Sequence, residues 1–123
     1  MSRHKETPSA LLMAAVAPES TITDARGRVL VLRKPKYLER TRLMKALGKN
    51  STNVGYISMV LPASWVRSID GEAVDMPTTE LELELLAAQL DDEGMEAVLT
   101  HMTRDAEAVE ADAEGVQEQV KNG

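Results

Sequence analysis

Apolar residues in the last quarter of the chain recur every three or four positions. From Met95 onward they fill two alternating places of a heptad, namely Met95, Leu99, Met102, Ala106, Val109, Ala113, Val116 and Val120. Such a heptad forms the apolar seam of an amphipathic helix that packs lengthwise on another helix, as in a coiled coil. Alanine and valine dominate after Met102, and Gly115 costs about 1 kcal/mol relative to alanine. We therefore expect this helix to be completed on a partner.

Two shorter patterns upstream predict β-hairpins. Between residues 21 and 33, β-branched residues flank a turn that contains Asp24 and Gly27. Between residues 65 and 74, apolar residues flank the Asp70-Gly71 pair, which is a strong two-residue hairpin signal. Each pattern predicts a pair of short antiparallel strands.

Helical signals follow the first hairpin. Pro35 fits the first turn of a helix, where its missing N–H costs nothing, and Gly48 is typical of a helix end. The polar stretch over residues 49–53 is expected to be a linker. A more apolar helix is expected over residues 54–64, and Pro62 should kink or end it because an interior proline breaks the hydrogen-bond ladder.

Another helical segment begins after a capping signal. Thr79 followed by Glu82 predicts a capping box, and such a cap typically contributes ~1 kcal/mol. The helix is expected over residues 80–90. The two aspartates that follow interrupt it, and the last helix begins near Glu93.

Together these elements predict an α+β fold that is mainly α-helical. It contains short β-hairpins, about four to five helices and a C-terminal amphipathic helix. We divide the chain into a basic N-terminal segment over residues 1–18, a small α+β domain over residues 19–102, and an acidic, partly ordered helical tail over residues 103–123.

The N-terminal segment contains an apolar run at residues 10–17, which predicts a short helix that ends before Pro18. The run follows basic residues and so imitates a secretion signal. Glu6 and Pro8 interrupt the approach to it, and we therefore favour the helix. No stretch approaches the roughly 20 apolar residues that span a bilayer, so that no membrane partner is expected.

Charge divides the chain into two halves of opposite sign. Residues 1–50 contain eleven Lys and Arg against four Asp and Glu, whereas residues 51–123 contain three against sixteen. Charge sign governs long-range attraction and the choice of partner. We predict head-to-tail self-association, in which Arg40, Arg42 and Lys45 of one copy meet the acidic half of another.

Residue types that perform catalysis or bind metals are sparse. The chain has no cysteine, which excludes disulfides and thiolate chemistry. Its two histidines, His4 and His101, lack the spacing of any metal-binding motif. The carboxylates of residues 91–93 are interpreted as a helix N-terminus, where negative charge is favourable. We predict no catalytic, cofactor-binding or metal site, and we do not expect an enzyme.

The basic helix over residues 34–49 is the one plausible nucleic-acid surface. A dedicated nucleic-acid binder combines basic patches with aromatic residues, whereas here Tyr37 is the only aromatic residue on the helix and the whole chain has a net charge of −6. A nucleic-acid partner is therefore not favoured.

Short blocks of sequence occur in order along residues 20–102. They are residues 23–28 (TDARGR), 31–35 (VLRKP), 46–48 (ALG), 69–74 (IDGEAV), 77–79 (PTT) and 90–95 (LDDEGM), with Asn53, Tyr56 and Met59 between them. In this combination they resemble the small tail assembly chaperones of long-tailed, siphovirus-type bacteriophages and prophages.

The resemblance implies a non-enzymatic role in the host-cell cytoplasm. Proteins of this family bind the tape measure protein, keep its apolar helices soluble and help to recruit tail-tube subunits, and they are not expected in the mature virion. Gly27, Gly71 and Gly94 then have structural roles. We expect the partner-binding contacts at the seam residues Met95, Leu99, Met102, Val109 and Val116.

Two other functions remain open from the residues alone. One is a small nucleic-acid-associated regulator that uses residues 34–49. The other is a permanent structural tail subunit, in which the C-terminal helix forms a lasting coiled-coil tie.

Overall fold

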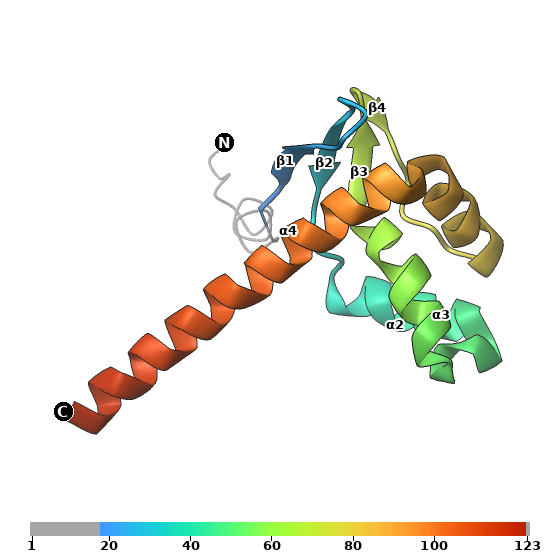
Figure 1. The fold of residues 1–123 in the computed structure, drawn as a ribbon. Coiled ribbons are helices and arrows are strands. Elements are labelled where there is room, and N and C mark those ends of the chain that lie inside the picture. The colour runs from blue at the N-terminus through green and yellow to red at the C-terminus, as the bar shows by residue number, and fades with distance from the viewer. Residues whose placement is uncertain (1–17, 123) are drawn as a thin grey trace, which may run out of the picture.

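The computed structural model describes the backbone of residues 18–122 and the side chains as far as residue 111 (Figure 1). The short helix predicted at residues 10–17 therefore lies outside the described residues. The described part combines one β-sheet with helices, so the predicted mixed α+β class is confirmed.

Four short strands form one antiparallel sheet. Their order across the sheet is the order in the chain, namely β1 (Ser20–Thr23), β2 (Val29–Leu32), β3 (Val66–Ile69) and β4 (Glu72–Ala73). Both predicted hairpins are confirmed, because β1 pairs with β2 and β3 pairs with β4. The pairing of β2 with β3, with Leu30 opposite Ile69, joins the two hairpins.

The turns owe their shape to the residues that the sequence pattern identified. Gly27 and Gly71 have φ angles of 82° and 85°, which side chains other than glycine rarely adopt. In the first turn, Asp24 Oδ1 accepts hydrogen bonds from the N–H groups of Arg26 (3.0 Å) and Arg28 (2.9 Å). In the second, Asp70 Oδ1 accepts from Val29 N–H at 2.8 Å, so this turn also holds the start of β2.

Three α-helices accompany the sheet within residues 18–122. They are α2 (Tyr37–Leu47), α3 (Val54–Val60) and α4 (Glu80–Asn122). Two 3₁₀ helices precede and follow α3, namely η1 (Gly48–Thr52), where we expected a linker, and η2 (Leu61–Trp65).

The predicted number of four to five helices is wrong for this part of the chain. The interruption expected after residue 90 is present, since Asp91 has φ 57° and ψ −168°, but it is a single residue within one long element. The helix expected over residues 54–64 ends at Val60, and the segment with Pro62 winds as η2, where proline occupies the first turn.

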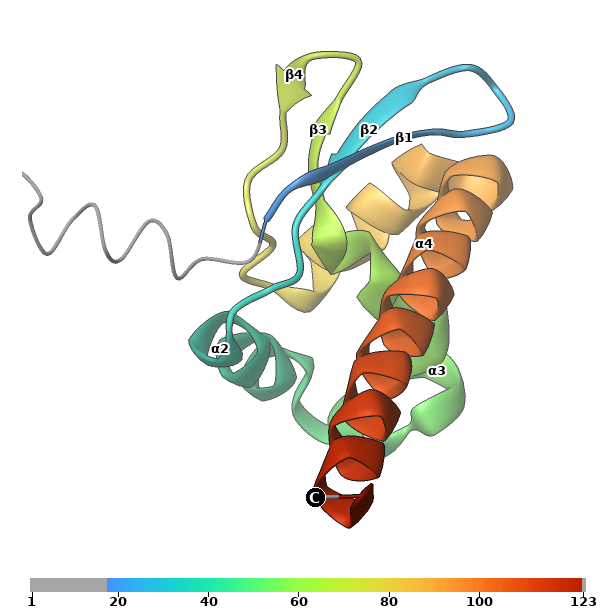
Figure 2. The same ribbon diagram turned by 90° about the vertical axis from the view of Figure 1, so that its left-hand side faces the viewer.

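The core lies between one face of the sheet and the helices. α2 and α3 lie at the end of the sheet opposite the hairpin turns, and α4 passes along the domain and projects beyond it (Figures 1 and 2). Burying a leucine contributes roughly 1.5–3 kcal/mol. The buried apolar residues are Leu30, Leu32, Leu43, Leu47, Val60, Ala63, Val66, Ile69, Leu83, Leu86, Leu90 and Val98.

Candidate partner-binding surface

The interruption at Asp91 divides α4 into a first part, residues 80–90, and a second part, residues 92–122. The second part contacts the domain along a narrow stripe. Gly94 is buried and Val98 is 0% exposed, and both lie on the same side of the helix because they are four residues apart. An α-helix turns about 100° per residue. Met95 and Leu99, each one residue after a buried position, are therefore directed roughly a quarter turn away from the buried stripe. Val109, eleven residues after Val98, lies on nearly the same side as Val98 but is exposed.

The structure separates the five predicted partner-binding residues. Met95 and Met102 are half-buried and pack against the core of their own domain. Leu99 is 45% exposed and Val109 is 61% exposed. Val116 belongs to α4, but its side chain lies outside the described residues. The available apolar positions are thus Leu99 and Val109, with the two methionines at the edge of the domain.

After Asp105, α4 extends past the rest of the domain. All described side chains from Ala106 to Ala111 are exposed. The helical backbone continues to Asn122, and Figure 1 shows it projecting past the sheet and the other helices. We call residues 106–122 the α4 arm.

The first part of α4, in contrast, is held by the hairpin turn between β1 and β2. Arg28 donates from Nη1 to the carbonyl oxygen of Gln89 at 2.9 Å and from Nη2 to that of Leu90 at 2.6 Å. These carbonyls come just before Asp91, where the helical hydrogen bonding is interrupted, and so they need other donors. Arg28 Nε also lies 2.8 Å from Asp24 Oδ2. We call these contacts the break clamp.

The acidity of Asp24 reflects its place in the break clamp. Burial raises the pKa of this carboxyl group, but hydrogen bonds from the backbone and guanidinium of Arg28, together with that from the Arg26 N–H, outweigh it. The pKa of Asp24 therefore lies below its ordinary value. Asp24 is thus ionised at neutral pH and holds the guanidinium in position.

Arg26 adds two ion pairs between the basic and the acidic half. Its Nη2 lies 2.9 Å from Asp91 Oδ2 and its Nε lies 3.1 Å from Glu93 Oε1. The side chains of both pairs are about half exposed, and we expect each pair to contribute about 1 kcal/mol or less. A Cβ atom added to Gly94 would lie 2.8 Å from Leu90 Cβ and 3.1 Å from Arg28 Nη2. Only glycine permits this close approach.

The break clamp brings together two sequence blocks that carry the family resemblance. Residues 23–28 form the hairpin turn, and residues 90–95 form the interrupted part of α4. Their polar side chains are engaged with each other. The blocks therefore shape the fold and leave partner contacts to other residues.

The predicted self-association residues all lie on α2, but only Arg42 and Lys45 are on its outward face. Arg40 donates from Nη1 to the Pro35 carbonyl oxygen at 2.7 Å and lies over the Tyr37 ring, 5.9 Å from its centroid. It is thus engaged within its own helix. Arg42 and Lys45 are exposed and form no ion pair with any described side chain.

A polar contact joins α3 and η1 to the start of α4. Asn50 Nδ2 donates to Glu80 Oε2 at 2.6 Å, and the Tyr56 hydroxyl donates to the Glu84 carboxylate. Burial, followed by the bonds and charges of Glu84 and Glu80, raises the pKa of Tyr56 well above its usual range. These contacts hold the first part of α4 against η1 and α3.

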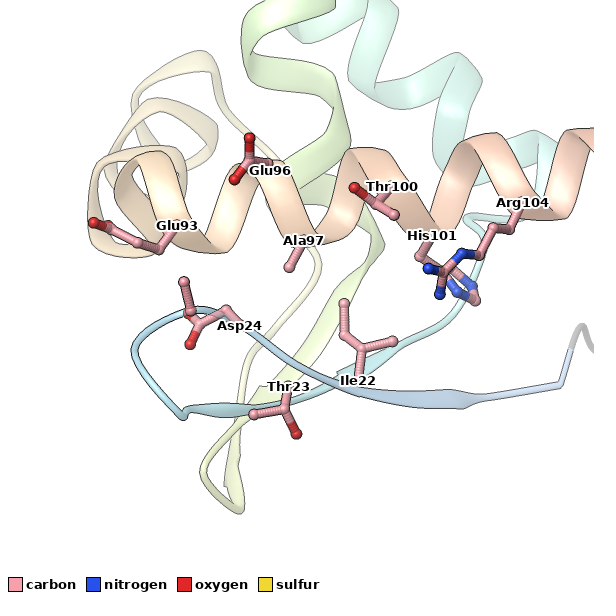
Figure 3. Close-up of a pocket in the computed structure, with 10 residues that line it drawn as sticks. Ile22, Thr23, Asp24, Glu93, Glu96, Ala97, Thr100, His101 and Arg104 are labelled. Carbon is pink, nitrogen blue, oxygen red and sulfur yellow. The ribbon is translucent and has the colours of Figure 1, made fainter.

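A shallow groove of about 300 Å³ runs between β1 and α4 (Figure 3). Glu93 and Glu96 lie at one end, and His101 and Arg104 at the other. His101 is half-buried and packs edge-on against Trp65, with ring centroids 6.0 Å apart. Over residues 18–111, no group of three or more His, Cys, Asp or Glu side chains is placed to hold a metal ion.

The sequence analysis missed a second exposed apolar surface. Leu81 and Leu85 point to solvent from the first part of α4, whereas Leu83 is buried. Leu85 borders a groove of about 320 Å³ beside Val74 and Pro77. The i, i+4 spacing of Leu81 and Leu85 is the signal that could have indicated this surface.

Comparison with known proteins gives no relative: no family model, no curated protein and no solved structure matches this chain. In the part of the chain that the structure describes, no helix is both long and apolar enough to cross a membrane.

Proposed function

We propose that this chain is a phage tail assembly chaperone. In this role it binds an apolar helical segment of the tape measure protein along α4 and helps to recruit tail-tube subunits during tail morphogenesis. It acts in the host-cell cytoplasm and is absent from the finished virion. The ordered sequence blocks over residues 20–102 support the family assignment by resemblance.

The single observation that carries the proposal is the exposure of apolar seam residues on α4. Leu99 is exposed because it lies to the side of the buried stripe, and Val109 is exposed because it lies beyond the domain. Met95 and Met102 flank the exposed seam from the domain edge, and methionine adapts its shape to varied apolar partners. A helix with i, i+3, i+4 and i+7 apolar positions is a common means of binding another helix.

Co-expression with the neighbouring tape measure product, followed by pull-down, tests the proposal. The double variant Leu99→Asp and Val109→Asp should reduce capture at least about tenfold, equivalent to 1.4 kcal/mol of binding free energy. A control with Ala108→Asp and Ala111→Asp adds the same charge to exposed positions on the other side of α4 and should bind normally. Equal capture by all three proteins would refute the assignment of the seam.

One observation favours a second candidate, a small nucleic-acid-associated regulator. Arg42 and Lys45 point outward from α2 without a carboxylate partner among the described side chains. Phosphate contacts of this kind give binding that weakens steeply with salt. A gel-shift experiment at low salt decides between the two: absence of binding removes this candidate.

A permanent structural tail subunit is distinguished by location. A chaperone leaves the completed tail, whereas a structural subunit stays in it. Detection of the chain in purified mature particles by mass spectrometry would overturn the chaperone role in favour of the structural one.

A further inference from the structure

The outer edge of β1 presents backbone groups that form no hydrogen bond within the described residues. β1 is the first strand of the sheet and pairs only with β2. Asp24 N–H donates to the Arg28 carbonyl oxygen at 3.1 Å, so residues 24 and 28 form a hydrogen-bonded pair. Bonded and non-bonded pairs alternate in antiparallel strands. The N–H and C=O groups of Thr21 and Thr23 therefore point away from β2.

The strand opposite β1 shows the same alternation. Val29 is the register partner of Thr23, but its backbone bonds toward β3. Its N–H donates to Asp70 Oδ1 at 2.8 Å, and its carbonyl oxygen accepts from Asp70 N–H at 2.8 Å. The Val29 N–H is thus not available to Thr23.

β1 also lacks the features that protect an open strand edge. Natural proteins usually protect such edges with charged side chains, proline or a covering element, because an open edge is a template for another strand. Residues 20–23 read STIT and contain neither a charge nor a proline. Thr21 and Thr23 are exposed. The edge can therefore accept an added strand by β-augmentation.

The flank of α4 beside β1 carries opposite charges at its two ends. Figure 3 shows the second part of α4 running opposite to β1, with Arg104 toward the beginning of the strand and Glu96 toward its end. Both side chains are exposed, and neither forms an ion pair with a described side chain. The small residues Ala97 and Thr100 line the groove between them.

The spacing of these charges defines the chemistry of the occupant. Arg104 follows Glu96 by eight residues, or about 12 Å along a helix. An extended peptide covers about 13 Å in four residues, and its alternate side chains face the same side. A strand added antiparallel to β1 continues the antiparallel sheet and runs toward Arg104. A basic residue beside Glu96 then precedes an acidic residue beside Arg104 by four positions.

We propose that the outer edge of β1 binds an extended segment of another protein as a fifth, antiparallel strand. The segment carries a basic residue for Glu96 and, four positions later, an acidic residue for Arg104. This site is separate from the α4 seam, because Ala97 and Leu99 lie on opposite sides of the buried Val98. It therefore does not depend on the proposed chaperone role.

A peptide titration followed by NMR tests the site in the full chain. The probe is the acetylated and amidated peptide Thr-Lys-Thr-Val-Thr-Glu-Thr. Its saturable binding should slow amide exchange at Thr21 and Thr23 and leave Ile22, which already bonds to β2, unchanged. The same peptide with Lys and Glu exchanged should bind at least about fivefold more weakly, because both ion pairs become repulsive.

Two sets of variants separate the charge contacts from the backbone contacts. Glu96→Lys combined with Arg104→Glu should reverse the preference between the two peptides. Thr21→Pro removes an outward N–H and leaves the bonds to β2 intact, so it should weaken binding at least about tenfold. Thr21→Val keeps this N–H and should bind like the wild type. Far-UV circular dichroism checks that each variant is folded.

Three results would overturn the proposal. One is equal binding of the two peptides by the wild type together with no reversal in the charge-exchanged variant. Another is unchanged binding by a folded Thr21→Pro variant. The third is protection of the Thr21 and Thr23 amides before any peptide is added, with no binding of the probe, because a second copy or the chain's own N-terminal residues then occupy the edge.

Discussion

The first part of α4 and the α4 arm are both helical, but the first part is tied to the rest of the protein and the arm is exposed. The first part is tied by the break clamp, where Arg28 reaches the carbonyls of Gln89 and Leu90 across about sixty residues of sequence. The arm has no such contacts among its described side chains. The contrast separates the residues that build the fold from those available to a partner.

The difference also explains the charge pattern. Arg26 of the basic half is paired with Asp91 and Glu93 of the acidic half, so part of the opposite charge stabilises the domain internally. Arg42, Lys45 and the carboxylates of the arm are left over. These remaining charges are the ones that can attract another molecule at long range.

The largest effect is expected from Arg28→Ala. This change leaves Asp24 Oδ2 and two helix-end carbonyls without the guanidinium donor, whereas Asp24 Oδ1 keeps its backbone donors. Loss of one partner of a buried pair costs 3–5 kcal/mol, and we expect about 3 kcal/mol because the Arg28 side chain is 16% exposed. Urea unfolding measures the loss; Arg42→Ala, the exposed control, should change stability by less than about 0.5 kcal/mol. Equal effects would contradict the break clamp.

A smaller loss is expected from Gly94→Ala. The added methyl group must displace Leu90 and Arg28, and overpacking of this kind costs about 1–3 kcal/mol. Gly55→Ala is the matched control, because its Cβ would meet its nearest neighbour at an ordinary 3.7 Å. That control should be neutral or up to about 1 kcal/mol more stable, since alanine favours a helix. Thermal unfolding of both variants measures the difference, and a stabilised Gly94→Ala would show that the clamp is loose.

Acid should weaken the clamp progressively. The folded state lowers the pKa of Asp24 below its ordinary value of 3.8, so the stability from its ionised form is complete above that pH and declines as the pH falls further. The difference in stability between wild type and Arg28→Ala should therefore narrow below pH ~4 to the part that comes from the Gln89 and Leu90 carbonyls. Urea midpoints measured from pH 7 downward test this. A constant difference at all pH values would mean that Asp24 does not contribute through its charge.

The parts of the fold that depend on neighbouring residues could be predicted from the sequence. Asp24 with Gly27 and Asp70 with Gly71 determine their turns through local backbone geometry, and Gly48 ends α2 in the same local way. The interruption near residue 91 also follows from local residue types. These signals act between residues a few positions apart, so they can be interpreted without knowledge of the tertiary structure.

Contacts between distant segments could not be predicted in the same way. Nothing in the spacing of Arg28 indicates that it caps a helix ending at Leu90, and nothing in the β2 pattern selects β3 as its neighbour. The heptad identified the apolar positions of α4, but its own domain took up the side with Gly94 and Val98. Which side is used depends on the position of the sheet, and a helical pattern does not contain that information.

The sequence also could not show which of the predicted basic contact residues are already engaged within the protein. Arg40 is part of the same basic run as Arg42 and Lys45, but only the structure shows that it binds the Pro35 carbonyl and the Tyr37 ring. Leu38 is instead exposed on the same side of α2 as Arg42 and Lys45. A charge count cannot distinguish a cation that is engaged from one that is free.

Hydrogen exchange along α4 tests the central claim most directly, because it compares the two parts of one helix in one experiment. In the isolated protein, amides of residues 84–90 and 96–100, on either side of the interruption at Asp91, should be protected, and those of the arm should exchange quickly, since stability is not uniform across a structure. Bound to the tape measure product, the arm should become protected while residues 84–100 change little. Arm protection that is equally high with and without the partner, or unchanged exchange on binding, would contradict the account.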